Sequence, residues 1–91
     1  MTIRLEKPAN LKDVLRVVER DAIKNSIKFK REETQGSGEG MGFAGRYVIH
    51  EDHIEVTVTK KPFIVSASRV NNEVQKYWKQ ACTVAGIKQI L

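Results

Sequence analysis

Two histidines and a carboxylate form the pattern in the sequence that most resembles a set of metal ligands. His50 and His53 flank Glu51 and Asp52 in "HEDH", and Glu55 lies two residues beyond the second histidine. If Glu51 and Asp52 form a turn between two strands, both histidines project from one face together with Glu55. Imidazole and carboxylate groups are ligands that zinc accepts. We therefore treat His50, His53 and Glu55 as a candidate metal site, with two exposed histidines at a hairpin tip as the alternative.

The glycines of "GMGFAG" (40–45) fit the G-x-G-x-x-G spacing of a dinucleotide-binding turn. That turn needs a strand before the glycines and a helix after them, so that the helix N-terminus meets the pyrophosphate. Here the motif is followed by "RYVIH", which alternates with the period of a strand. We expect a hairpin connection in which Gly42 or Gly45 allows a bulge or close packing, and we expect no cofactor.

The nucleophilic and acidic side chains lack the sequence context of catalytic residues. Cys82 lies at helical spacing from apolar residues, which favours a buried structural role. Ser66 and Ser68 precede a predicted helix and are typical helix caps, without an elbow motif around them. The acidic pairs 32–33 and 51–52 are adjacent in sequence, and adjacent strand residues point to opposite faces. We expect no catalytic residue and a protein that is not an enzyme.

Positive charge is gathered in rows along the chain. The sequence has 16 Lys and Arg against 11 Asp and Glu, a formal net charge of +5, which favours anionic partners. A phosphate backbone is recognised by clustered cations, so the rows predict a polyanion-binding face. The alternative is a solvated helix face that interspersed acidic residues partly neutralise. The candidate polyanion-binding residues are Lys12, Arg16, Arg20, Lys24, Lys28, Lys30, Lys60 and Lys61.

Hydrophobic periodicity predicts the elements that must position these groups. Alternating patterns indicate strands, and apolar stripes at helical spacing indicate helices. The predicted order is a strand at 2–6, a helix at 11–24 with Asn10 as its N-cap, a strand at 26–32, a hairpin of strands at 43–50 and 53–59, and a last helix that Ser66 or Ser68 caps and Gly86 ends. The glycine-rich segment 34–42 is expected to be a flexible loop, and the apolar residues 87–91 to form a tail.

The order β-α-β-β-β-α predicts an α+β two-layer sandwich. We expect a mainly antiparallel sheet of three or four strands, with the two helices packed on one face. In the hairpin, Tyr47 should pair with Val56 and Ile49 with Ile54, all on the buried face. With 91 residues the chain is a single domain, 1–91, and its modest core leaves little room for an enclosed active site.

Composition also bears on the compartment. One cysteine allows no intrachain disulfide, so nothing ties the chain to an oxidising compartment. The first ten residues lack the apolar region of a secretory signal, and no apolar run is long enough for a membrane span. We expect a cytoplasmic protein, as a monomer or homodimer.

Residues 43–78 resemble the small polyhydroxyalkanoic acid system protein family, which is linked to polyester granule gene clusters. The resemblance covers a glycine before a strand, an acidic turn, an alternating valine strand, a Pro-Phe pair and a final helix; "TIRLEKP" before a helix also fits the family's opening. The matching residues are Gly45, Asp52, Val56, Val58, Pro62 and Phe63. The resemblance implies a non-enzymatic accessory protein that contacts a granule surface or apolar polymer, with no catalytic residues to carry over.

Two alternatives remain open for the partner. The expected helix–three strands–helix order is that of a double-stranded RNA-binding domain, although the Gly-Pro-x-His loop and the Lys-Lys-x-Ala-Lys run of that domain are missing. That interpretation predicts nucleic-acid binding through the basic helix face. A groove between sheet and helices near the glycines could instead admit an apolar ligand, and an unidentified protein partner is a further expectation.

Overall fold

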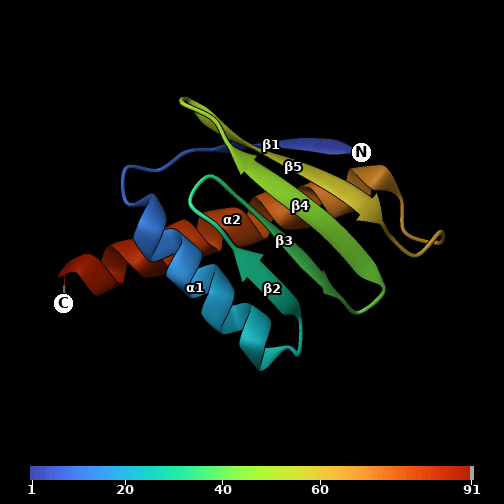
Figure 1. The fold of residues 1–91 in the computed structure, drawn as a ribbon, viewed down its shortest axis with the longest axis horizontal. Helices are drawn as coiled ribbons and strands as arrows, with labels where there is room; N and C mark the ends of the chain where they lie inside the picture. The colour runs from blue at the N-terminus through green and yellow to red at the C-terminus, as the bar shows by residue number, and fades with distance from the viewer. Residues whose placement is uncertain (91) are drawn as a thin grey trace.

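The protein is an α+β two-layer sandwich of one antiparallel sheet and two helices (Figure 1). The computed structural model describes residues 1–90, with side chains described as far as Gly86. Its elements in chain order are β1 (Thr2–Glu6), α1 (Leu11–Lys24), β2 (Lys28–Arg31), β3 (Gln35–Gly40), β4 (Phe43–Ile49), β5 (His53–Lys60) and α2 (Ala67–Ile90). The predicted fold class is confirmed, but the sheet has five strands, in the order β1-β5-β4-β3-β2, rather than three or four.

The additional strand is β3, which occupies most of the segment predicted to be a flexible loop (34–42). Its glycines at 36, 38 and 40 alternate, so all three lie on the same face of the sheet as Tyr47. A Cβ at Gly36 would overlap the ring of Tyr47, and one at Gly40 would come within 3.1 Å of Ile27. Glycine is a poor strand former, but here its missing side chain makes room for neighbouring strands' residues.

Two aromatic rings lie across this glycine strand. Phe29 of β2 and Tyr47 of β4 stack over β3 with their ring centroids 6.1 Å apart and an interplanar angle of 19°. Phe29 is paired with Gly38, and Tyr47 with Gly36. The aromatic pair therefore covers the backbone that the glycines leave bare, and this contact joins three strands on the helix-facing side.

The β4–β5 hairpin has the predicted register. Tyr47 pairs with Val56, Ile49 pairs with Ile54, and the His50 amide donates to the His53 carbonyl at 2.8 Å. The expected bulge is present at Gly45, where the register shifts. The β3–β4 connection is a two-residue turn, Met41 and Gly42, and both residues have positive φ as in a type I′ turn. The dinucleotide-like glycines thus belong to a hairpin followed by a strand, as predicted.

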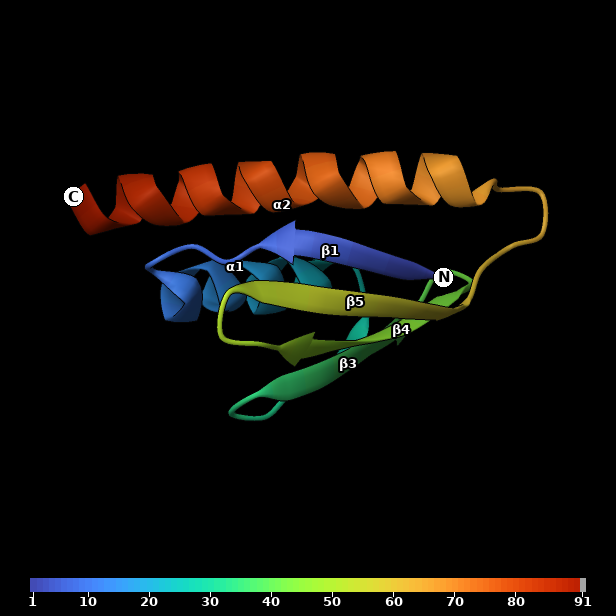
Figure 2. The ribbon, with the colours of Figure 1, turned by 90° about the horizontal axis from the view of Figure 1, so that it is seen from above.

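The core lies between one face of the sheet and the two helices. The buried cluster combines residues of β1 and β5 with residues of both helices; its members are Ile3, Leu5, Val14, Leu15, Val17, Ile54, Val70, Trp78, Ala81 and Ala85. Helix α2 runs along the edge strand β1 (Figure 2). From it, Trp78 Nε1 donates to the Glu6 carbonyl at 2.8 Å and Gln75 Nε2 to the Arg4 carbonyl at 2.9 Å. The helix therefore satisfies edge carbonyls that would otherwise invite another strand.

The ends of the helices differ partly from the predictions. Ser66 caps α2, because its Oγ accepts from the Arg69 amide at 3.2 Å. Asn10 stands at the N-cap of α1, but its side chain makes no capping hydrogen bond. The predicted stop at Gly86 is wrong, since α2 continues to Ile90; glycine costs a helix about 1 kcal/mol but does not end it by itself. The expected tail 87–91 is accordingly helical through Ile90, and Leu91 lies outside the described residues.

Two tyrosine hydroxyls should contribute differently to stability. The Tyr77 hydroxyl joins α2 to α1 by donating to Asp21 Oδ2 at 2.7 Å, whereas the Tyr47 hydroxyl is buried with no hydrogen-bond partner among the described residues. We expect Tyr77→Phe to lower the free energy of unfolding by about 1–2 kcal/mol, and Tyr47→Phe to leave it unchanged or raise it. Urea unfolding at pH 7 measures both, and equal losses in the two variants would contradict the assignment.

The contribution of the Tyr77–Asp21 hydrogen bond to stability should depend on pH. Burial, together with the hydrogen bond to Asp21, raises the pKa of Tyr77 well above its ordinary range. The unfolded chain then loses this proton first, so the Tyr77 contribution is complete below about pH 10 and declines as the pH rises further. The stability difference between wild type and Tyr77→Phe should therefore shrink above about pH 10.

Candidate functional site

Large apolar side chains are exposed at one end of the sheet. The β3–β4 turn and the β5–α2 loop lie together there (Figures 1 and 2), and a Cβ on Gly42 would meet Pro62 at 3.4 Å. Phe63 is 93% exposed, Ile64 81% and Met41 74%. Phe43, which begins β4, is also exposed. We call these four residues, Met41, Phe43, Phe63 and Ile64, the apolar tip.

The loop that carries the apolar tip is fixed by hydrogen bonds. The Val65 amide donates to the Pro62 carbonyl at 3.1 Å, which closes a β-turn with Phe63 and Ile64 at its two central positions. Lys61 Nζ donates to the Val65 carbonyl at 2.7 Å and ties the turn from the other side. These bonds hold Phe63 and Ile64 at the outside of the turn, away from the core.

The chain around this turn carries only positive charge. Residues 56–72 include Lys60, Lys61 and Arg69 and no acidic residue. Lys60 is exposed at the end of β5, and Lys61 is held beside the turn by its hydrogen bond. Apolar side chains next to lysines suit the boundary of an apolar phase that carries anionic groups.

The structure divides the predicted polyanion-binding residues into separate groups. The row on α1, made of Lys12, Arg16, Arg20 and Lys24, is exposed on the helix layer. Two of these cations have acidic neighbours, since Arg16 lies 3.7 Å from Asp13 and Arg20 lies 3.7 Å from Asp21. Lys28 and Lys30 alternate with Phe29 and so lie on the opposite side of the sheet, while Lys60 and Lys61 flank the apolar tip. The single basic face predicted from sequence is therefore not formed.

The open face is the sheet face opposite the helices. On this face, Arg46 lies beside Lys28 and Lys30. Lys30 pairs with Ser37, and Ser37 pairs with Arg46, so the three form a row across β2, β3 and β4. These residues line a shallow hollow of about 440 Å³ that also includes Glu39. Arg46 is not among the residues predicted from the sequence, because its place beside the lysines requires β3 between them.

A second hollow lies between sheet and helix, although none of the glycines near which a groove was predicted lines it. It measures about 730 Å³ and lies between the start of α1 and the β2–β3 connection. Leu11, Leu15 and Ile49 give it an apolar lining. Its charged lining is mixed: Lys7, Lys12, Arg16 and Arg31 occur together with Asp13, Glu32 and Glu33. The balance of charge gives this groove no clear preference for an anionic or a cationic ligand.

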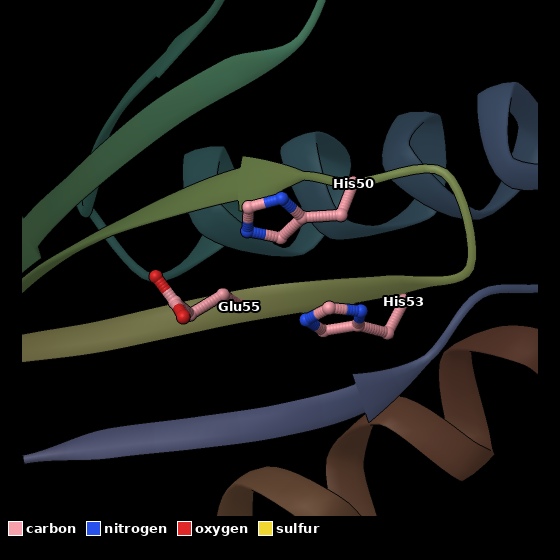
Figure 3. Close-up of side chains that lie close together, drawn as sticks. All are labelled: His50, His53 and Glu55. Carbon is pink, nitrogen blue, oxygen red and sulfur yellow. The ribbon is translucent and has the colours of Figure 1, made fainter.

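The three predicted metal ligands do come together (Figure 3). Each of His50, His53 and Glu55 offers a ligand atom, and these atoms all lie within 4.8 Å of one another. The two imidazoles stack with centroids 4.6 Å apart at an interplanar angle of 20°. His53 Nδ1 lies 2.6 Å from Asp52 Oδ1, a contact that sequence reasoning missed. The hydrogen bond from His53 lowers the pKa of Asp52, with a further contribution from Arg4.

The cysteine and the two serines considered as nucleophiles have roles in packing and in the start of α2. Cys82 is half-buried against the core, and burial raises the pKa of its thiol, which disfavours the reactive thiolate. Ser66 is the cap of α2, and Ser68 lies within the first turn of that helix. No histidine contacts either serine in the hydrogen bonds of the described residues.

No protein family, curated protein or solved structure matches the chain in sequence or structure comparisons. Within the described residues, no helix has both the length and the apolar character needed to cross a membrane. The alternative based on a double-stranded RNA-binding domain expected three strands between the helices, and the structure has four.

Proposed function

We propose that the protein is a non-catalytic accessory protein that adsorbs to the surface of an apolar granule through its apolar tip. The observation that carries this proposal is the exposure of Phe63 and Ile64 on a hydrogen-bonded turn, at 93% and 81%. Single exposed apolar residues are ordinary, but neighbouring ones of this size at one end of a small domain are typical of an interaction surface. The resemblance to polyhydroxyalkanoic acid system proteins supports a polyester granule as the apolar phase.

The expected strength of the contact follows from burial and charge. Burying one large apolar side chain contributes about 1.5–3 kcal/mol, so Phe63 and Ile64 together contribute about 3–6 kcal/mol. A lysine next to an anionic surface adds about 1 kcal/mol. Lys60 and Lys61 therefore favour a granule whose boundary carries carboxylate or phosphate groups, while the apolar side chains supply most of the adsorption energy.

The test is sedimentation of the full chain with poly(3-hydroxybutyrate) particles, bare or coated with anionic phospholipid. We expect the double variant Phe63→Ser/Ile64→Ser to lose at least about 100-fold in partition coefficient, because about 3 kcal/mol of burial is removed. Ile23→Ser is the matched control: Ile23 is 72% exposed but belongs to α1 and is not one of the four residues of the apolar tip. Binding to bare particles indicates polymer as the partner, and binding only to coated particles indicates the lipid.

Three results would contradict the proposal. Adsorption of the Phe63→Ser/Ile64→Ser variant at the wild-type level would show that the apolar tip is not the contact. An equal loss in Ile23→Ser would show unspecific adsorption. A wild-type dimer in light scattering that dissociates in the double variant, without particle binding, would assign the tip to a second copy of the chain.

Nucleic-acid binding is a second candidate function, and a separate binding experiment tests it. The row of Lys30, Ser37 and Arg46 on the open face is the feature that favours it. Duplex RNA that binds at low salt, is released as salt rises, and no longer binds Lys30→Glu/Arg46→Glu would assign function to the open face instead of the apolar tip.

A further inference from the structure

We propose that His50, His53 and Glu55 form a binding site for a divalent transition metal, with Zn²⁺ as the best-fitting ion. The site lies at the β4–β5 turn, at the opposite end of these strands from the apolar tip. It is independent of the proposed adsorption to granules.

The hairpin register brings the three side chains to one face. His50 and His53 face each other across the turn, since the His50 amide donates to the His53 carbonyl at 2.8 Å. Glu55 is two residues further along β5 and projects from the same side as His53. Figure 3 shows both imidazoles and the carboxylate on this side of the hairpin. His53 and Glu55 thus belong to β5, and His50 directly follows β4 and is tied to His53 by this hydrogen bond.

Asp52 prepares His53 to bind a metal. Its Oδ1 lies 2.6 Å from His53 Nδ1, so the Nδ1–H donates a hydrogen bond to the carboxylate and the lone pair of the neutral ring is on Nε2. A carboxylate behind a ligating imidazole is a common arrangement at zinc sites, because it fixes the ring and increases its basicity. Arg4 lies 3.6 Å from Asp52 Oδ2 and holds the carboxylate from its other side.

Small side-chain rotations suffice to complete the site. Ligand atoms that share a tetrahedral zinc lie about 3.4 Å apart, given zinc–ligand distances of about 2.0–2.2 Å. The three ligand atoms already lie within 4.8 Å of one another, so χ rotations of His50 and Glu55 can close the difference. Two imidazoles and one carboxylate suit zinc better than magnesium or calcium, which prefer oxygen ligands alone. Three protein ligands leave a fourth position for water or for a group of a partner.

The local charge favours a cation. Four carboxylates, those of Glu6, Glu51, Asp52 and Glu55, come from the turn and from the strands beside it. The nearby cations are Arg4, which contacts Asp52, and Lys7. Lys7 Nζ donates to the His50 and Glu51 carbonyls at 3.0 and 3.2 Å, so its charge lies at the backbone of the turn.

The test is a titration of the full, untagged chain with Zn²⁺ in competition with a chromophoric chelator, with Co²⁺ absorption as a second readout of coordination. We expect one metal per chain, loss of binding in His50→Ala and in His53→Ala, and at least a 10-fold loss of affinity in Asp52→Asn. Glu51→Gln is the matched control, because it removes a charge from the same turn but no ligand. Its affinity should stay within about 3-fold of wild type if the ligand geometry, and not general negative charge, holds the metal.

Two outcomes would overturn the metal site. One is the absence of a one-to-one complex at micromolar wild-type protein. The other is wild-type affinity in the His50→Ala/His53→Ala variant, which would place the metal elsewhere, such as at Cys82. The substitutions lie at an exposed turn, and circular dichroism of each variant verifies that the fold is retained.

Discussion

Replacing Gly36 by alanine is expected to lower the free energy of unfolding by about 2–3 kcal/mol, the range of an overpacked core position. The added Cβ would overlap the ring of Tyr47, which lies directly on the Gly36 backbone and packs against the core. Tyr47 cannot move away freely, because it stacks on Phe29 and is flanked by the helix layer. Urea unfolding followed by far-ultraviolet circular dichroism measures the loss.

Gly38→Ala is the matched control for that experiment. It lies on the same face of the same strand, but its Cβ would meet Phe29 Cδ1 at 3.8 Å, an ordinary contact. We expect Gly38→Ala to be unchanged or up to about 1 kcal/mol more stable, because alanine restricts the unfolded chain. In a double-mutant cycle, Tyr47→Ala should remove most of the penalty of Gly36→Ala. Equal effects of the two glycine substitutions would show that strand propensity, and not the Tyr47 contact, decides the result.

Trp78→Ala is expected to have the largest effect on stability, a loss of about 3–5 kcal/mol. The ring is buried in the core cluster between the helices and the sheet, and its Nε1 donates to the Glu6 carbonyl at 2.8 Å. A small domain has only about 5–15 kcal/mol of stability, so this loss removes a large part of it. Urea unfolding by circular dichroism measures the change without the tryptophan fluorescence signal.

Two further substitutions separate the contributions of Trp78. Trp78→Phe keeps most of the apolar burial but leaves the Glu6 carbonyl without the indole donor, so we expect a smaller loss of about 1–2 kcal/mol. Lys79→Ala, at the exposed neighbouring position of α2, should stay within about 0.5 kcal/mol of wild type. A Trp78→Ala variant as stable as Lys79→Ala would mean that α2 is not held on β1 by this side chain.

Local pattern alone determined much of this protein. Alternation around "ED" predicted the β4–β5 register down to the Tyr47–Val56 and Ile49–Ile54 pairs, because a buried face fixes strand register within one hairpin. The strand-like "RYVIH" predicted that the "GMGFAG" glycines lie in a hairpin connection, and they occupy the end of β3, the turn and the start of β4. The same register placed His50, His53 and Glu55 on one side of the hairpin, so the geometric basis of the metal site follows from the alternation of the two strands.

Only the tertiary structure decided the state of the glycine-rich segment. Its residues carry no apolar alternation, so nothing in the local pattern marks Gln35–Gly40 as a strand. The segment becomes β3 because side chains of β2 and β4, among them Phe29 and Tyr47, need the space above the glycines. The residues that occupy this space lie on other strands, and the local strand propensity of the glycine segment takes no account of them.

Contacts between elements also decided the candidate surfaces. With β3 in place, Lys30 and Arg46 share a row on the open face, while the α1 cations lie on the other side of the molecule. The Asp52 contact that orients His53 depends on side-chain geometry within the turn. The position of Phe63 and Ile64 outside the core depends on the Pro62–Val65 hydrogen bond. Sequence determines which residues alternate or repeat, because those periods are local; which face is covered, and which residues remain exposed, is decided only when the elements pack.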